Sequence, residues 1–144
     1  MTDFLNICLT SEQIGAVSNL GLAHIGDCVY ELLVRSYLVC RGTQTNQELH
    51  RATVSFVSAP AQARAMERLL PLLTEQESAV YRRGRNTRVN SVPKNAALRD
   101  YHAATGLETL FGWLYLNGAH ARINELFAAA LADGEQEKDT TDAS

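Results

Sequence analysis

The sequence predicts an all-α fold, and three observations support this prediction. Apolar residues recur three and four positions apart through most of the chain, which is the periodicity of helices with one buried face. Signals that begin and end helices follow one another at short intervals along the 144 residues. No stretch shows the alternation of apolar and polar residues that a useful β-strand would need. With 46% hydrophobic and 20% charged residues, the composition is that of one globular domain.

Caps and helix breakers divide the chain into short segments. A capping pattern at Thr10 begins a helix that extends to about Val17. A long helix follows from residue 19 to about residue 40, where Arg41 and Gly42 form a stop signal. A third helix is expected from Thr45 or Asn46 to a break at 58–60, followed by helices at 61–70 and from Thr74 to about Arg83. Residues 84–95 are expected to form a loop, and the last three helices are expected at 96–104, 105–117 and 119–131.

The long helix has one apolar face and one polar face. Its apolar periodicity predicts the residues that face the core: Leu22, Ile25, Val29, Leu32, Leu33 and Ser36. The opposite side carries polar residues at spacings of three and four, which makes their side chains neighbours: His24, Asp27, Glu31 and Arg35. The helix therefore combines packing with candidate chemistry.

The polar face has two interpretations. It is either a solvated stripe in which Asp27 and Glu31 pair with Arg35, or a site for a hard divalent cation with Asp27 as an oxygen ligand. Gly26 costs about 1 kcal/mol relative to alanine inside a helix, so close packing or close approach of a ligand would explain it. We expect His24 to be a hydrogen-bonded neighbour of Asp27 rather than a catalytic base.

Glu108 is a second candidate, because it lies in a segment that is apolar on nearly all sides. Such a helix is expected to be largely buried. A buried carboxylate requires a cation or several hydrogen bonds, or else it takes up a proton. The alternatives are a structural ion pair with an arginine and a metal ion shared with Asp27.

Residues 78–99 contain no acidic residue but six of the thirteen lysines and arginines: Arg82, Arg83, Arg85, Arg88, Lys94 and Arg99. Arginine forks and short polar side chains match phosphate oxygens well. Tyr81 is the only aromatic residue in this stretch, which argues against base stacking on single strands. The stretch therefore predicts binding to the backbone of an anionic polymer, with duplex RNA favoured.

The net charge of −3 is unevenly distributed along the chain. Residues 133–144 hold five acids and one lysine, and their composition predicts a disordered acidic tail after a folded domain at 1–132. Cys8, Cys28 and Cys40 have no metal-site spacing and are expected to be free thiols. No signal peptide or membrane-spanning run is apparent, so we expect a cytoplasmic protein.

Two motifs resemble those of the ribonuclease III family. Residues 22–31 (LAHIGDCVYE) are similar to its signature helix, and residues 105–116 (TGLETLFGWLYL) are similar to its second acidic motif. Residues 54–59 (VSFVSA) and 92–95 (VPKN) resemble the Mini-ribonuclease III subfamily, which lacks a double-stranded-RNA-binding domain. The resemblance implies the helical endonuclease fold of this family and a homodimer. Full-length members have further acids at positions that match Leu20, Ala23 and Thr105, which favours one metal ion per protomer here.

The resemblance also implies a function. Asp27 and Glu108 would be the catalytic carboxylates and the ligands of Mg²⁺, in an endoribonuclease that cuts double-stranded RNA and leaves 5′-phosphate and 3′-hydroxyl ends. The expected substrate is a stem in precursor large-subunit (23S) ribosomal RNA, and whether a ribosomal protein shapes that stem stays open. RNA contacts are expected from Arg82, Arg83, Arg85, Asn86, Arg88, Lys94 and Asn95. The alternatives are a non-catalytic RNA-binding module of ribosome assembly on the same fold, and a helical protein–protein adaptor.

Overall fold

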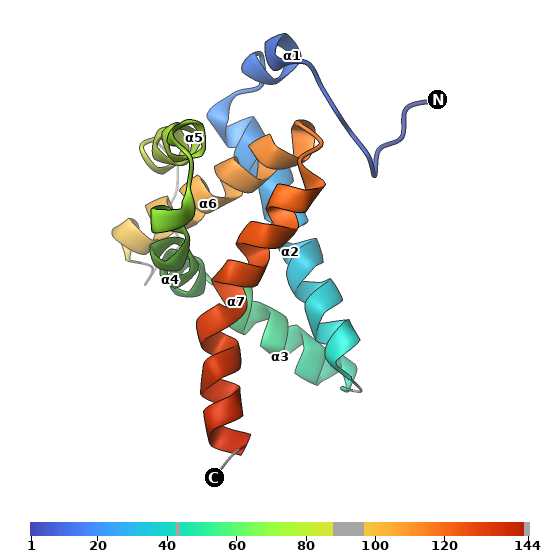
Figure 1. The fold of residues 1–144 in the computed structure, drawn as a ribbon, viewed down its shortest axis with the longest axis vertical. Coiled ribbons are helices and arrows are strands. Elements are labelled where there is room, and N and C mark those ends of the chain that lie inside the picture. Colours follow the sequence, from blue (N-terminus) through green and yellow to red (C-terminus); the bar gives the residue numbers. More distant parts are fainter. Residues whose placement is uncertain (43, 88–96, 143–144) are drawn as a thin grey trace.

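The computed structural model describes residues 1–42, 44–87 and 97–142, with the backbone alone for residues 132–142. These residues form an all-α protein without a strand, which confirms the predicted fold class. None of the helices in this part of the chain is long and apolar enough to cross a membrane. The elements in Figure 1 are α1 (Ser11–Gly15), α2 (Asn19–Arg41), α3 (Asn46–Val57), α4 (Ala59–Leu69), the short 3₁₀ helix η1 (Leu70–Leu72), α5 (Glu75–Arg85), α6 (Leu98–Leu116) and α7 (His120–Asp142).

Hydroxyl caps begin the helices where the sequence predicts them. Thr10, Thr45 and Thr74 each form a capping box: the threonine hydroxyl accepts a hydrogen bond from the backbone N–H three residues later, and that residue's side chain accepts one from the threonine N–H. The hydroxyl of Ser58 caps α4, and Pro60 lies in the first turn of that helix. Local sequence therefore defines these four starts.

α6 is one continuous helix, whereas the sequence predicted two helices that meet at Thr105. The hydroxyl of Thr105 donates a hydrogen bond to the carbonyl oxygen of Tyr101, one turn earlier, and the backbone stays helical. Gly106, next to the predicted boundary, provides space for Tyr81 of α5. A Cβ atom on Gly106 would lie 2.5 Å from the Tyr81 ring.

α5 extends to Arg85, two residues beyond its predicted end, because Gly84 is a packing position rather than the start of a loop. A Cβ atom on Gly84 would lie 2.3 Å from the Thr109 hydroxyl oxygen of α6. The pair formed by Gly84 and Thr109 therefore brings the basic end of α5 against the middle of α6.

α2 has the predicted length, but its buried face is rotated from the predicted one. Its buried residues are Leu22, Ala23, Gly26, Tyr30, Val34 and Leu38. By contrast, Leu32 is 61% exposed, and Ser36 is exposed as well. The reason is that α2 packs directly on the backbone of α6. Only small residues such as Ala23 and Gly26 fit at so close a contact, so the face of α2 that carries them is the buried one.

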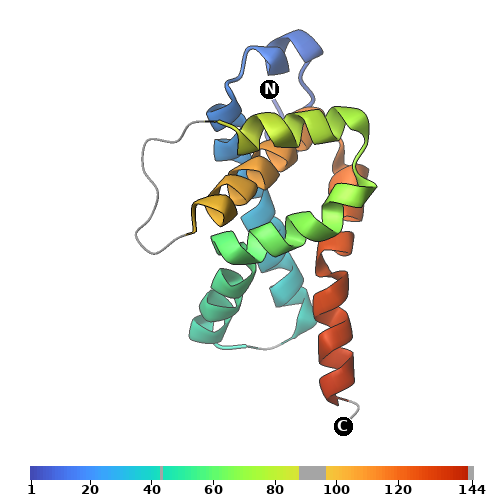
Figure 2. The same cartoon turned by 90° about the vertical axis from the view of Figure 1, so that its left-hand side faces the viewer.

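α6 is the centre of the protein. Figure 2 shows it between α2 on one side and α4 and α5 on the other, and α7 packs against it as well. The side chains of Leu107, Leu110 and Phe111 are completely buried in the core. Tyr30 of α2 contacts the rings of Phe111 and Phe127 edge-on, at centroid distances of 5.2 and 5.7 Å. Burial of α6, which the sequence predicted, is confirmed.

α7 is joined to the start of α5 by a nearly buried ion pair. Arg122 lies 2.8 Å from Glu77, whose side chain is 6% exposed, and it also donates a hydrogen bond to the carbonyl oxygen of Leu72. The Arg122 guanidinium lowers the pKa of Glu77. The backbone of α7 continues as helix to Asp142, through most of the segment expected as a disordered tail. The division into a domain at 1–132 and a tail at 133–144 stays a prediction.

Candidate active site

Two glycines allow the backbones of α2 and α6 to touch. A Cβ atom on Gly26 would lie 1.6 Å from the carbonyl oxygen of Glu108, and one on Gly112 would lie 1.9 Å from the carbonyl oxygen of Leu22. Neither position accepts a larger residue unless the helices move apart. Asp27 directly follows Gly26, so this contact brings Asp27 next to Glu108.

The two carboxyl groups lie in an environment that resists negative charge. Burial raises the pKa of Glu108 to about 8, and the charge of Asp27 adds to this shift. Partial burial also raises the pKa of Asp27, with a further contribution from Glu31 and an opposing one from His24. Both shifts arise first from desolvation, and repulsion between neighbouring carboxylates adds to them.

No lysine or arginine of the described residues is seen to pair with Asp27 or Glu108, although His24 partly offsets the charge of Asp27. Arg35 pairs with Glu31 at 2.8 Å on the exposed surface, and it does not pair with Asp27. The solvated-stripe interpretation therefore holds for Glu31 and Arg35 alone. The alternative of a structural arginine partner for Glu108 finds no support in the described part of the chain, where desolvation and Asp27 are what act on its charge.

The residues present fit a magnesium ion. Mg²⁺ prefers oxygen ligands, commonly one or two carboxylates with several water molecules. Among the residues that the structure describes, no group of three or more His, Cys, Asp or Glu side chains could hold a metal ion. The chain would thus supply Asp27 and Glu108, and the remaining ligands would be water or RNA oxygens.

The raised pKa of Glu108 predicts how stability depends on pH without metal. Its carboxyl group binds a proton up to about pH 8 in the folded protein, but only up to its usual value of 4.5 when unfolded. The free energy of unfolding should therefore fall as pH rises from 4.5 to 8, by up to about 1.4 kcal/mol per pH unit from this group.

Denaturant unfolding in EDTA from pH 5 to pH 8.5 would measure this effect. Other groups also titrate in that range, so the relevant quantity is the difference between Glu108→Gln and wild type. Glu108→Gln should gain stability relative to wild type as pH rises, whereas Glu67→Gln, at an exposed position of α4, should not. A difference that does not change with pH would contradict the prediction.

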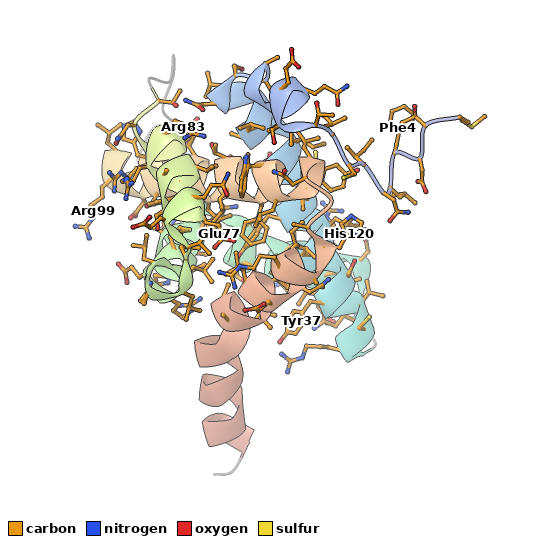
Figure 3. The ribbon with its side chains drawn as sticks, turned by 45° about the horizontal axis from the view of Figure 1, so that its top comes forward. Phe4, Tyr37, Glu77, Arg83, Arg99 and His120 are labelled. Carbon is orange, nitrogen blue, oxygen red and sulfur yellow. The ribbon has the colours of Figure 1, made fainter. Side chains whose placement is uncertain are left out.

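Three of the predicted RNA contacts, Arg82, Arg83 and Asn86, are exposed at the end of α5. The guanidinium of Arg85 lies over the Tyr81 ring, 5.6 Å from its centroid, and donates a hydrogen bond to the side-chain oxygen of Asn86. Figure 3 shows Arg83 and Arg99 on the side of the molecule formed by α5 and the beginning of α6. The described part of the basic surface is therefore built on α5 and the beginning of α6.

The other predicted contacts, Arg88, Lys94 and Asn95, lie outside the described residues. Their RNA-binding role stays a prediction.

Sequence analysis missed three residues that build the site. Gly112 opens the contact between α2 and α6, and the pair formed by Gly84 and Thr109 seats α5. A glycine within a strongly apolar helix was the available signal for Gly112, because such a residue costs stability unless another backbone approaches it.

A model of the ribonuclease III domain matches residues 20–119, which include both carboxylates. A Mini-ribonuclease 3 from Clostridium tetani is 40% identical over 124 residues, which cover 85% of this chain and 82% of the relative. One from Symbiobacterium thermophilum is 46% identical over 111 residues, which cover 77% and 85%. The chain belongs to the ribonuclease III family. Its relatives place it in the Mini-ribonuclease 3 branch, and hence among hydrolytic endonucleases.

The fold agrees with this membership. A crystal structure of a Fusobacterium nucleatum protein superposes with a TM-score of 0.77 at 25% sequence identity, and the match covers 85% of this chain and 98% of that one. The predicted family and the predicted helical fold are both confirmed.

Proposed function

We propose that this protein is a Mg²⁺-dependent endoribonuclease that cuts double-stranded RNA and leaves 5′-phosphate and 3′-hydroxyl ends. One observation carries the proposal: Asp27 and Glu108 lie on touching helices and repel each other electrostatically, and no arginine or lysine of the described residues is seen to pair with either. A half-buried carboxyl group with a strongly raised pKa near a second carboxylate is typical of a functional site. Family membership supplies the class of reaction.

The chain's own residues account for most of the chemistry. Asp27 and Glu108 would hold the ion, and the contact at Gly26 keeps them together. When bound, Mg²⁺ supplies a polarised water and stabilises charge on the phosphate. The water oxygen would bond to phosphorus and release its proton to the solvent as the bond from phosphorus to O3′ breaks. O3′ takes a proton, so the phosphate remains on the 5′ end of the downstream fragment.

The simplest test is cleavage of a labelled RNA duplex in Mg²⁺ and in EDTA. We expect paired cuts in Mg²⁺, product ends that a 5′-phosphate-dependent exonuclease degrades, and no cleavage in EDTA. Binding without cleavage under any divalent ion would instead favour the non-catalytic assembly module. Neither binding nor cleavage would favour the adaptor.

The basic surface is proposed to hold the RNA backbone through Arg82, Arg83, Arg85 and Asn86, together with Arg88, Lys94 and Asn95. Replacing Arg82 by glutamine should weaken duplex binding several-fold and reduce the slope of log K against log salt by about 0.7–0.9, the effect of one lost phosphate contact. Arg51→Gln, at an exposed position of α3, is the matched control. Unchanged salt dependence in the Arg82 variant would show that this residue does not contact an RNA phosphate.

We propose a homodimer, because cutting both strands requires two sites. The support in the structure is an exposed apolar stripe on α2, the helix that carries Asp27: Leu32 is 61% and Val39 is 64% exposed. These residues are seven positions apart and share one helix face.

Leu32→Glu should convert the dimer to a monomer and reduce duplex cleavage at least about tenfold, since a buried unpaired charge costs several kcal/mol at an interface. Light scattering coupled to gel filtration measures the mass. The control is Val54→Glu, which changes an apolar residue of α3 that is 49% exposed. A wild-type protein that is monomeric at micromolar concentration would contradict the dimer.

The family also suggests the biological setting. We propose a stem of precursor 23S ribosomal RNA as the natural substrate, in the cytoplasm, with a ribosomal protein as a candidate partner that shapes the stem. Accumulation of unprocessed 23S precursor in cells that lack the gene would test this assignment, and normal 23S ends would refute it.

A further inference from the structure

A hollow of about 440 Å³ lies between α1, α2, α5 and α6. Its apolar wall includes Ile14, Leu22 and the half-buried Trp113, and its polar wall includes Asn19, Gln76 and Arg83. No acidic side chain of the described residues lines it. The function proposed above uses only Arg83 of these residues.

The chemistry of this lining matches a nucleotide. An aromatic ring offers a face on which a base can stack, and side-chain amides can donate to and accept from the edge of a base. A guanidinium matches a phosphate group. A base that is paired within a duplex cannot reach such a hollow, because its faces are already stacked and its edge is already paired.

The hollow continues into the surface that is proposed to hold the RNA backbone. A second, more open hollow of about 630 Å³ shares Asn19 and Arg83 with the first, and its other lining residues include Arg82, Asn86 and Thr87. Arg83 stands where the two meet, on the edge of α5 that faces α1 (Figure 3). An RNA strand could therefore place one nucleotide in the first hollow while its sugar-phosphate backbone continues along the second.

The hollow lies on the same two helices as the carboxylates, but it faces another side of them. Leu22 precedes Asp27 by five residues on α2, and Trp113 follows Glu108 by five residues on α6. Five residues of helix span about 7.5 Å along the axis and turn by about 140° around it. The contact between Gly112 and the carbonyl oxygen of Leu22 ties the two helices together at this level. A bound nucleotide would thus lie within a few nucleotides of the cut.

We propose that this hollow binds one unpaired nucleotide of the RNA substrate, with its base on Trp113 and its phosphate at Arg83. The inference rests on the proposed function and deepens it, because the preferred substrate becomes a duplex with a bulged or unpaired nucleotide next to the cleavage site. The base supplies affinity through stacking, and the amides of Asn19 and Gln76 contact its edge.

Trp113 is the chain's only tryptophan, so its fluorescence reports on the hollow directly. In EDTA, wild-type protein is titrated with a paired duplex, the same duplex with one bulged adenosine, the same duplex with an abasic bulge, and free AMP. We expect strong quenching and about tenfold tighter binding for the bulged adenosine alone, as stacking of one base provides. Equal quenching and affinity for all three duplexes would overturn the proposal. So would micromolar binding of AMP without a preference for the bulged duplex.

Gln76 is the position for a variant, because it is exposed and belongs only to the first hollow. Gln76→Ala should reduce the preference for the bulged duplex about threefold while cleavage of the paired duplex is unchanged. Gln47→Ala, at an exposed position of α3, is the matched control. Trp113→Leu should abolish the preference, and Trp113→Phe should retain part of it if Trp113→Leu does not fold. A preference that survives in both Gln76→Ala and the Trp113 variants would overturn the proposal.

Failure of this inference is distinguishable from failure of the proposed function. Cleavage of the paired duplex in Mg²⁺ tests the nuclease alone. The difference between bulged and paired duplexes in EDTA tests the hollow alone.

Discussion

Replacing Asp27 by asparagine lowers the rate of duplex RNA cleavage by at least about 10³-fold and leaves the affinity for the duplex within about twofold of wild type. Asparagine keeps the size and the hydrogen-bonding capacity of the side chain but removes the negative charge. A divalent cation requires this charge, because no group of three or more possible metal-ligating side chains occurs among the described residues, which leaves few ligands to replace Asp27. The basic surface on α5 is unchanged, so binding persists.

Single-turnover cleavage and filter binding on the same duplex would separate the two effects. Glu108→Gln should behave like Asp27→Asn, since the two carboxylates act on one ion and their losses are not additive. Glu67→Gln, which removes an exposed carboxylate from α4, should cleave at the wild-type rate. An Asp27 variant that retains more than a tenth of the activity would place the catalytic centre elsewhere.

Metal affinity provides an independent check on the same site. The raised pKa of Glu108 means that this carboxyl group must release a proton before it can bind a cation. Apparent affinity for Mg²⁺ should therefore rise with pH up to about 8 and then level off. Asp27→Asn should bind Mg²⁺ more weakly at every pH.

The local part of the fold was predictable from the sequence, but the contacts between helices were less so. Capping boxes at Thr10, Thr45 and Thr74 involve residues three apart, so the starts of α1, α3 and α5 are encoded locally. The apolar character of residues 105–117 correctly indicated a buried segment. These signals do not depend on which element lies opposite.

The errors arose where a glycine had a partner in another helix. Gly84 was expected to begin a loop, and a helix boundary was expected at Thr105, next to Gly106. The helices continue through both glycines, and Thr109 and Tyr81 occupy the space of their missing side chains. The same effect rotates the buried face of α2, where Gly26 packs on a backbone and Leu32 remains exposed. A single sequence does not reveal which backbone approaches a glycine, so it does not define helix boundaries and buried faces there.

In the candidate site, too, the individual residues could be predicted from the sequence but their contact across helices could not. Asp27 and Glu108 could be named from residue type and setting, since a carboxylate in an apolar helix demands an explanation. Their proximity depends on Gly26 and Gly112, which bring two helices into backbone contact. That proximity is what turns two separate carboxylates into one metal site.

Replacing Gly26 by alanine should therefore destabilise the protein strongly, by at least about 3 kcal/mol. Alanine is normally the better residue inside a helix, by about 1 kcal/mol, so the expected sign is opposite to the intrinsic preference. The new Cβ atom would lie 1.6 Å from the carbonyl oxygen of Glu108, and a backbone atom cannot rotate away as a side chain can. The helices must separate, which breaks packing along both.

Gly15→Ala in α1 is the matched control, because no atom lies within 4 Å of the position that its Cβ atom would take and the backbone there is helical. It should leave stability unchanged or raise it slightly. Urea unfolding of both variants measures the contrast. If Gly26→Ala folds with less than about 1 kcal/mol of loss, α2 and α6 do not make the close contact described at Gly26. If it folds but is destabilised as expected, its cleavage rate should fall with the separation of the two carboxylates, even though both are still present.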